Sequence, residues 1–146
     1  MNQAERRVWL IKALLDERPD GRNIAVPAGA NEQRDLLRAL MNVRPPEALA
    51  AETLDIQDAY LQQRLLERGG ATDAGALPYR DRVAIWRGDI TLLKADGIVN
   101  AANSQMLGCF VPGHHCIDNA IHTYAGMQLR LACANLMDEQ GHEEPT

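Results

Sequence analysis

A short segment, residues 108–116, concentrates side chains that bind metal ions. It reads Gly-Cys-Phe-Val-Pro-Gly-His-His-Cys, so two thiols and two imidazoles fall within eight residues. Thiolate and imidazole ligands suit a borderline-soft ion such as zinc. Pro112 and Gly113 favour a turn that brings the two ends of the segment together. Two cysteines and one histidine give three ligands with a fourth position open, which is typical of a catalytic zinc site, because structural sites usually have four protein ligands.

Structural alternatives remain open for the same segment. Cys109 and Cys116 could form a disulfide, could be a buried thiol pair, or could join both histidines in a closed four-ligand site. The chain has three cysteines, and an odd number is not typical of a disulfide framework. The third, Cys133, falls among apolar residues and is expected in the core. We therefore take reduced thiols as the starting assumption.

The segment is followed by a run with helical periodicity, Ile117 to Gln140. The first turn of this predicted helix presents N–H groups and the positive end of the helix dipole, which together favour a phosphate without any Lys or Arg. Asp118 could instead cap the helix, which is the commoner role of such a residue. His122, one turn further on, could support the site or be an ordinary half-buried histidine.

Two short β-rich runs precede the segment. Residues Arg82–Arg87 and Gly97–Ala101 are each predicted to be a strand. Asp89 follows the first run and Asn103 the second. Ligands of open α/β sheets bind beyond the carboxyl ends of the strands, so both side chains are expected at one sheet edge. Alternatively, Asp89 caps a turn and Asn103 is a turn residue.

The sequence of the first half of the chain predicts helices and indicates no catalytic or binding site there. One helix is expected over residues 4–17, a second after Asn31 as its N-cap, and a third from about Asp55 to Gly69. We therefore divide the chain into a helical extension, residues 1–75, and an α/β part, residues 76–146. The predicted fold class is α/β.

Composition restricts the partners of this 146-residue chain. Its net charge is −5, only 4% of its residues are aromatic, and residues 81–146 contain four Lys or Arg against eight acidic residues. Nucleic-acid binding, including binding by a zinc knuckle, depends on basic side chains and is therefore not expected. An anionic ligand would be held by backbone N–H groups, a helix end or a metal. Without an apolar run of 18 residues or a secretion signal, we expect a cytoplasmic protein with no membrane partner.

Taken together, these residues resemble a macrodomain, the α/β module that binds ADP-ribose. The zinc-loop residues are similar to one branch of that family, the zinc-containing microbial protein-ADP-ribose hydrolases. The stretches that carry the resemblance are 88–91 and 95–104 for the macrodomain opening, 108–112 with His114 and 116–122 for the zinc branch, and 40–46 for its N-terminal extension. The resemblance implies a three-layer α/β/α macrodomain behind the helical extension.

The resemblance also implies a reaction, the zinc-dependent hydrolysis of the bond between ADP-ribose and a protein side chain. Its substrate would be a mono-ADP-ribosylated protein, and its cofactor Zn²⁺. The implied zinc ligands are Cys109, His114 and Cys116, whereas His115 occupies a variable position and is not assigned. The implied catalytic residues are Asn103 and Cys116.

The implied ligand-binding residues extend from the adenine to the distal ribose. Asp89 would recognise the adenine amino group, with the backbone of Ile90 beside it. Asn103 would contact the distal ribose. Cys116, Ile117 and Asp118 would border the ligand, with helix N–H groups facing phosphate or ribose.

The sequence departs from such macrodomains in its length. It ends at residues 141–146, in what resembles the loop after the first long helix, and it contains no glycine-rich phosphate loop after residue 113. We therefore expect a fragment or a shortened form whose exposed sheet edges favour self-association. Two functions follow: a zinc-dependent ADP-ribosyl hydrolase, or alternatively a truncated, non-catalytic module that binds ADP-ribose and zinc.

Overall fold

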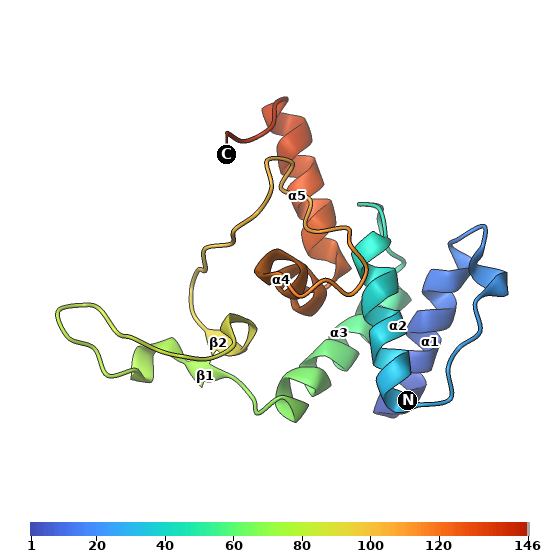
Figure 1. Ribbon diagram of the computed structural model, residues 1–146, viewed down its shortest axis with the longest axis horizontal. Coiled ribbons are helices and arrows are strands. Elements are labelled where there is room, and N and C mark those ends of the chain that lie inside the picture. The colour runs from blue at the N-terminus through green and yellow to red at the C-terminus, as the bar shows by residue number, and fades with distance from the viewer. Residues whose placement is uncertain (146) are drawn as a thin grey trace.

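A computed structural model describes residues 1–145 as a helical body with one extended arm (Figure 1). In chain order the helices are α1 (Gln3–Asp16), α2 (Ala30–Val43), α3 (Ala51–Glu67), α4 (Ile117–Ala125) and α5 (Met127–Gln140), and the strands are β1 (Thr72–Asp73) and β2 (Leu93–Lys94). Single 3-10 turns occur at Gly21–Asn23, Ala74–Ala76 and Ile90–Leu92. None of the helices in the described part of the chain has both the length and the apolar character of a membrane span.

The hydrophobic core lies among the first three helices. α1 begins with a capping box, in which the Asn2 side chain accepts from the Glu5 N–H and the Glu5 carboxylate accepts from the Asn2 N–H. The amphipathic faces of α1 and α2 pack together, as their apolar spacing predicts. The buried apolar residues of this core are Leu10, Ile11, Leu14, Leu15, Leu37, Leu40, Met41, Tyr60 and, from α5, Met127.

The predicted starts of two helices are wrong. α2 begins at Ala30 with Gly29 as its N-cap, and Asn31 lies inside the helix, where its side chain accepts from Arg34. α3 begins at Ala51, four residues before the predicted start at Asp55. Neither N-cap residue makes a side-chain hydrogen bond, so no capping side chain marks the start of either helix.

The predicted single helix from Ile117 to Gln140 is two helices, α4 and α5, separated at Gly126. This glycine has φ 93° and ψ 166°, a conformation that is essentially restricted to glycine. A Cβ atom there would also lie 2.7 Å from Nε2 of Gln57. The fully buried Gln57 accepts from the Met127 N–H at 2.9 Å and thereby binds the start of α5 to α3. The break therefore results from a tertiary contact.

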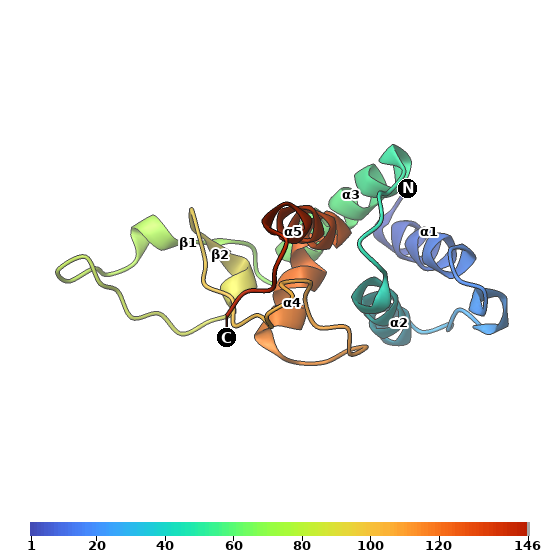
Figure 2. The same ribbon diagram turned by 90° about the horizontal axis from the view of Figure 1, so that it is seen from above.

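α5 is also fixed to α2 through a buried cation. The Arg130 guanidinium donates to the carbonyl oxygens of Arg44 at 2.6 Å and Met41 at 3.3 Å, both at the end of α2. It also donates to the Leu107 carbonyl at 2.7 Å. Viewed from above, α1 and α2 lie on one side of α4 and α5, and the arm lies on the other (Figure 2). The first three helices and the pair α4 and α5 thus form one packed unit.

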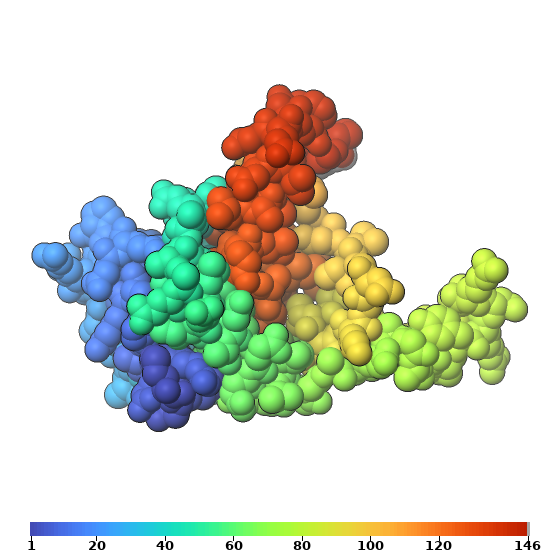
Figure 3. Space-filling model, turned by 180° about the vertical axis from the view of Figure 1, so that it is seen from behind, coloured from blue at the N-terminus to red at the C-terminus, as the bar shows by residue number. Residues whose placement is uncertain are grey.

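The arm, residues 71–95, projects from this body (Figure 3). β1 and β2 form a parallel pair there, with Thr72 opposite Leu93 and Asp73 opposite Lys94. The strands predicted at Arg82–Arg87 and Gly97–Ala101 are wrong, because the only ladder contact in either segment is an isolated bridge from Val83 to Arg80. Their apolar side chains face solvent: Ile85 is 92% exposed and Val99 90%. The proposed boundary near residue 75 stays a prediction, and β1 and β2 pair across it.

Candidate functional site

The structure brings the three predicted metal ligands together. One ligand atom each from Cys109, His114 and Cys116 lies within 4.8 Å of the other two. Cys109 Sγ and His114 Nδ1 are 3.5 Å apart. In a tetrahedral zinc site, the usual Zn–S and Zn–N bond lengths separate a sulfur from a nitrogen by about 3.6 Å. The donor set and its spacing therefore fit zinc, and the thiols are free rather than joined in a disulfide.

Glycine and a tight turn shape the loop that carries these ligands. The His114 N–H donates to the Val111 carbonyl at 3.1 Å, and Gly113 between them has φ 64°. Gly108, at the start of the loop, has φ 80°, and a Cβ atom there would lie 2.7 Å from the His122 ring. His115 is exposed and is not a member of the cluster that the described residues form.

Cys116 has a second role, as the N-cap of α4. Its Sγ accepts a hydrogen bond from the Asn119 N–H at 3.3 Å. The alternative in which Asp118 caps this helix is therefore wrong. The Asp118 side chain is buried, accepts from Asn100 Nδ2 at 2.7 Å and lies 3.6 Å from His122 Nε2. The first turn of α4 thus contains a buried carboxylate.

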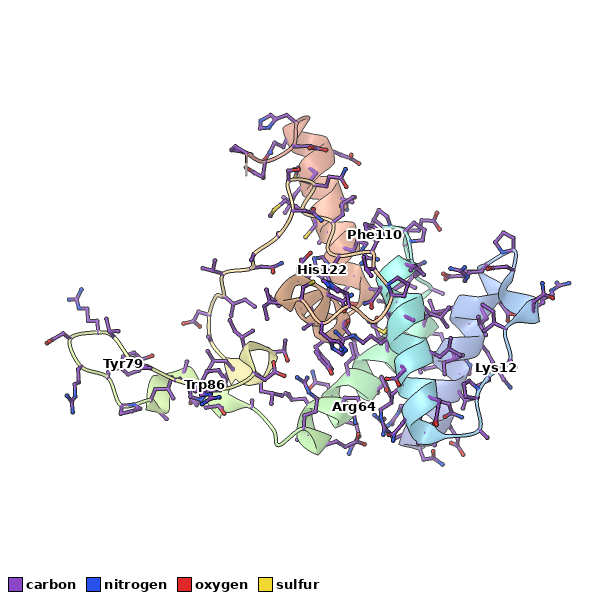
Figure 4. All side chains as sticks on the ribbon, in the orientation of Figure 1. Lys12, Arg64, Tyr79, Trp86, Phe110 and His122 are labelled. Carbon is purple, nitrogen blue, oxygen red and sulfur yellow. The ribbon has the colours of Figure 1, made fainter. Side chains whose placement is uncertain are left out.

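His122 packs against the loop from α4 and is 6% exposed (Figure 4). Burial lowers the pKa of His122 below its ordinary value of 6.5, the Asp118 carboxylate opposes this effect, and the Arg130 cation adds to it. The histidine is therefore neutral at neutral pH, and it is buried rather than half-buried.

The lowered pKa of His122 predicts a pH dependence of stability. The unfolded chain binds a proton near pH 6.5 more readily than the folded chain does, so acid favours unfolding. The free energy of unfolding should be fully retained above about pH 6.5 and fall below it, by at most about 1.4 kcal/mol per pH unit. Urea unfolding of the metal-free protein between pH 7.5 and 5.5 measures this, and His122→Gln should flatten the profile. The matched variant His142→Gln, at an exposed position, should keep the wild-type slope; equal slopes in all three proteins would contradict the assignment.

Asn103 lies beside the first residue of the loop. Its side-chain Nδ2 donates to the Gly108 carbonyl at 3.3 Å, and the residue is otherwise exposed. Because Cys109 follows Gly108, the amide of Asn103 is next to the cluster of predicted metal ligands. Both of its predicted roles, turn residue and ligand contact, are compatible with this position.

Asp89 is held at a different place, at the end of the arm. Its carboxylate accepts from the Thr91 N–H at 2.9 Å and from the Thr91 hydroxyl at 2.7 Å, so it caps the 3-10 turn that begins at Ile90. Arg68, at the end of α3, donates to the same carboxylate. Partial burial raises the pKa of Asp89, but the hydrogen bonds from Thr91 and the Arg68 guanidinium outweigh burial and bring the pKa below its usual value. The carboxylate is therefore ionised at neutral pH.

Helix α4 connects these two places. The Arg68 guanidinium lies 3.5 Å above the ring of Tyr124, near the end of α4. Ile90 and Tyr124 also line a hollow of about 340 Å³. Cys116, Ile117 and Asp118 lie at the opposite end of the helix, about 10 Å away at 1.5 Å per residue. The predicted adenine-binding residues therefore lie near the C-terminal end of α4, and the predicted ribose-binding residues lie at or beside the segment that leads into its N-terminal end. The two strands expected to align them do not form.

Residues that sequence reasoning missed surround the loop. The side chains of Arg38 and Asn42, on α2, and of Asn119, on α4, hydrogen-bond to the loop backbone. Arg38 and Asn42 are spaced by four residues, which places them on one face of α2. That spacing alone gives no indication that the face meets a segment more than 70 residues away.

Comparison with known proteins finds a family match in the second half of the chain and relatives that are similar over its whole length. Residues 99–146 match the Macro domain family. This Macro domain match begins just before Asn103 and includes the whole loop of residues 108–116, and it confirms the macrodomain resemblance over those residues. The chain is also 53% identical over 150 residues to a protein-ADP-ribose hydrolase from Treponema medium, a similarity that covers 100% of this chain and 58% of the relative.

A second relative gives the same result. The chain is 45% identical over 141 residues to a protein-ADP-ribose hydrolase from Staphylococcus aureus (strain MRSA252), covering 95% of this chain and 52% of the relative. The chain thus spans slightly more than half the length of these curated relatives. Both similarities include the helical region as well as the Macro domain segment, because they cover nearly all of the chain.

Proposed function

We propose that this chain carries the metal site of a zinc-dependent hydrolase that removes ADP-ribose from modified proteins. The observation that carries the proposal is the cluster of Cys109, His114 and Cys116 in a chain similar to proteins named protein-ADP-ribose hydrolase. Three ligands with a fourth position open are typical of catalytic rather than structural zinc. A module that only binds ADP-ribose has no evident need for such a site.

Each predicted residue has a specific task at the ribose end of the site. Zinc, when bound, would act as a Lewis acid that lowers the pKa of a coordinated water. Asn103, fixed beside Gly108, would orient the distal ribose through its amide. The N-terminal turn of α4, at Ile117 and Asp118, would face the ribose or phosphate with its N–H groups. Asn100 holds the Asp118 carboxylate at the inner side of that turn.

At the adenine end, Asp89 would accept a hydrogen bond from the exocyclic amino group, with the Ile90 backbone beside it. The ionised carboxylate suits this task, because an amino group is a donor and a charged acceptor strengthens the bond. Among the described residues, Arg68, at the end of α3, is the only Lys or Arg that donates to this carboxylate. The acidic second half of the chain would thus bind an anionic ligand mainly through backbone and metal.

A de-ADP-ribosylation assay tests the proposal. A mono-ADP-ribosylated protein is incubated with the zinc-loaded chain, with the chelator-treated chain, and with the full-length Treponema medium relative as a positive control. We expect release of ADP-ribose by the zinc-loaded chain and none after chelation. Binding of zinc and ADP-ribose without turnover, under conditions in which the relative is active, would contradict the hydrolase and favour the alternative, a non-catalytic ADP-ribose- and zinc-binding module.

A further inference from the structure

We propose that α2 is a positioning element for the metal site: Arg38 and Asn42 hold the loop of residues 108–116 in the conformation that binds metal. This inference rests on the proposed function, because it assumes that the loop binds zinc. It assigns a role to the helical region, for which the sequence predicts packing alone. The helix would set the metal affinity of a loop more than 70 residues away in the sequence.

Arg38 acts on the loop directly and through Asn119. Its guanidinium donates to the backbone carbonyl of His114, one of the three ligand residues, at 2.9 Å. It also donates to Asn119 Oδ1 at 3.1 Å from Nε and 2.7 Å from Nη2. A planar guanidinium that engages two acceptors at once fixes their relative position.

Asn119 carries this constraint to both cysteines. The residue is completely buried, and its side-chain Nδ2 lies 3.5 Å from the Cys109 carbonyl and donates to the Val111 carbonyl at 3.2 Å. Its backbone N–H donates to Cys116 Sγ at 3.3 Å. Together, Arg38 and Asn119 therefore contact all three ligand residues.

Asn42 holds the turn of the loop. Its Oδ1 accepts from the Gly113 N–H at 3.0 Å, immediately before His114. Its Nδ2 donates to the Thr123 hydroxyl of α4 at 3.0 Å, and Asn42 is 1% exposed. A side chain held this firmly between two helices can act as a rigid support for an exposed turn.

Such supports matter because the loop has little packing of its own. Phe110, Val111, Pro112 and His114 are exposed, and two glycines in the loop have positive φ. A loop that is already in its bound conformation loses less conformational entropy when it takes up a ligand. Groups that orient the ligands of a metal, without touching the metal, commonly change its affinity by about 10- to 100-fold.

Arginines one helical turn apart on α2 provide a matched test. Arg38→Met removes the contacts with the loop and with Asn119 and keeps an apolar stem. Arg34→Met makes the same chemical change at a position whose side-chain hydrogen bond is to Asn31 of its own helix. Zinc affinity is measured in the full chain by competition with a chromophoric chelator. We expect Arg38→Met to bind zinc about 10- to 100-fold more weakly and Arg34→Met to bind as wild type does. Equal affinities would overturn the proposal.

A second pair of variants separates loop positioning from loss of fold. Asn42→Ala removes the bonds to Gly113 and to Thr123. Thr123→Val removes the bond to Asn42 and the donation of its hydroxyl to the Asn119 carbonyl, and it leaves the bond between Asn42 and Gly113 in place. Thermal unfolding of the metal-free variants reports the fold, and the cobalt(II) absorption spectrum reports thiolate coordination. We expect Asn42→Ala to weaken zinc binding and alter the cobalt spectrum, with Thr123→Val close to wild type in both. If affinity instead follows the loss of thermal stability in all four variants, the role is structural and the proposal is overturned.

The outcome for the wild-type chain distinguishes this inference from the proposed function. If wild type binds zinc tightly and the α2 variants match it, the positioning role fails and the metal site stands. If wild type binds no zinc, the metal site fails, and the positioning role fails with it.

Discussion

Replacing Cys116 with serine is expected to abolish zinc binding and turnover while leaving α4 capped. A serine hydroxyl is a far poorer zinc ligand than a thiolate, so metal content should fall from about one zinc per chain to none. The hydroxyl still accepts from the Asn119 N–H, because serine is among the best N-cap residues. Metal analysis by mass spectrometry and the de-ADP-ribosylation assay measure the two losses.

Alanine at the same position separates the two roles of Cys116. Cys116→Ala loses the ligand and the cap together. The free energy of unfolding of the metal-free alanine variant should therefore be about 1 kcal/mol lower than that of the metal-free serine variant. Cys133→Ala is the matched cysteine control, because Cys133 lies on α5 outside the cluster, where burial raises the pKa of its thiol. It should retain zinc. One zinc per chain in Cys116→Ser would contradict the ligand assignment, and full turnover by a metal-free Cys116→Ala would contradict the zinc mechanism.

The cluster of Cys109, His114 and Cys116 could be predicted from the sequence because these residues are close together in the chain. Cys109 and Cys116 are seven residues apart, and Pro112 with Gly113 provides the turn between them. Within so short a segment, the residue types alone restrict the three side chains to a few relative positions. The supports of the loop could not be predicted, since Arg38 and Asn119 are separated by 81 residues and only tertiary packing brings them together.

The predicted strands illustrate the opposite case, because the two segments have the residue types of strands but do not form strands. Arg82–Arg87 and Gly97–Ala101 contain the β-branched residues typical of strands. A strand is stabilised by its hydrogen-bonded neighbours, however, and an isolated pair is at best marginally stable. Ile85 and Val99 are almost fully exposed, and apart from the isolated bridge between Val83 and Arg80 neither segment pairs with a strand in the described chain. Asp89 and Asn103 therefore lack the common sheet edge on which their alignment was predicted.

The predicted helix boundaries are wrong for a related reason. Apolar spacing correctly predicts that Leu37, Leu40 and Met41 are buried, since burial of one face stabilises a helix more than local propensity does. The break at Gly126 depends on Gln57, which approaches from α3 and accepts from the first N–H of α5. A lone glycine within a periodic run gives no such information.

Replacing Asp89 with asparagine is expected to weaken ADP-ribose binding without changing the zinc content. A hydrogen bond to a charged group contributes roughly 1.5–3 kcal/mol, so losing the charge of the acceptor predicts about a 10- to 100-fold weaker affinity. The asparagine oxygen can still accept from the Thr91 N–H, which preserves the turn. Calorimetry with ADP-ribose measures the affinity, and an affinity equal to that of wild type would refute the adenine role.

Asp73→Asn is the matched control for this substitution. Asp73 caps the 3-10 turn Ala74–Ala76, and its Oδ1 accepts from the N–H two residues later at 2.9 Å, the same contact that Asp89 makes with Thr91. Its affinity for ADP-ribose should equal that of wild type. A similar loss in both variants would attribute the effect to the shape of the arm rather than to adenine. Asp89 lies near the end of α4 that is remote from Cys116. A loss of zinc in Asp89→Asn would therefore contradict the separation of the predicted adenine contact from the predicted metal ligands.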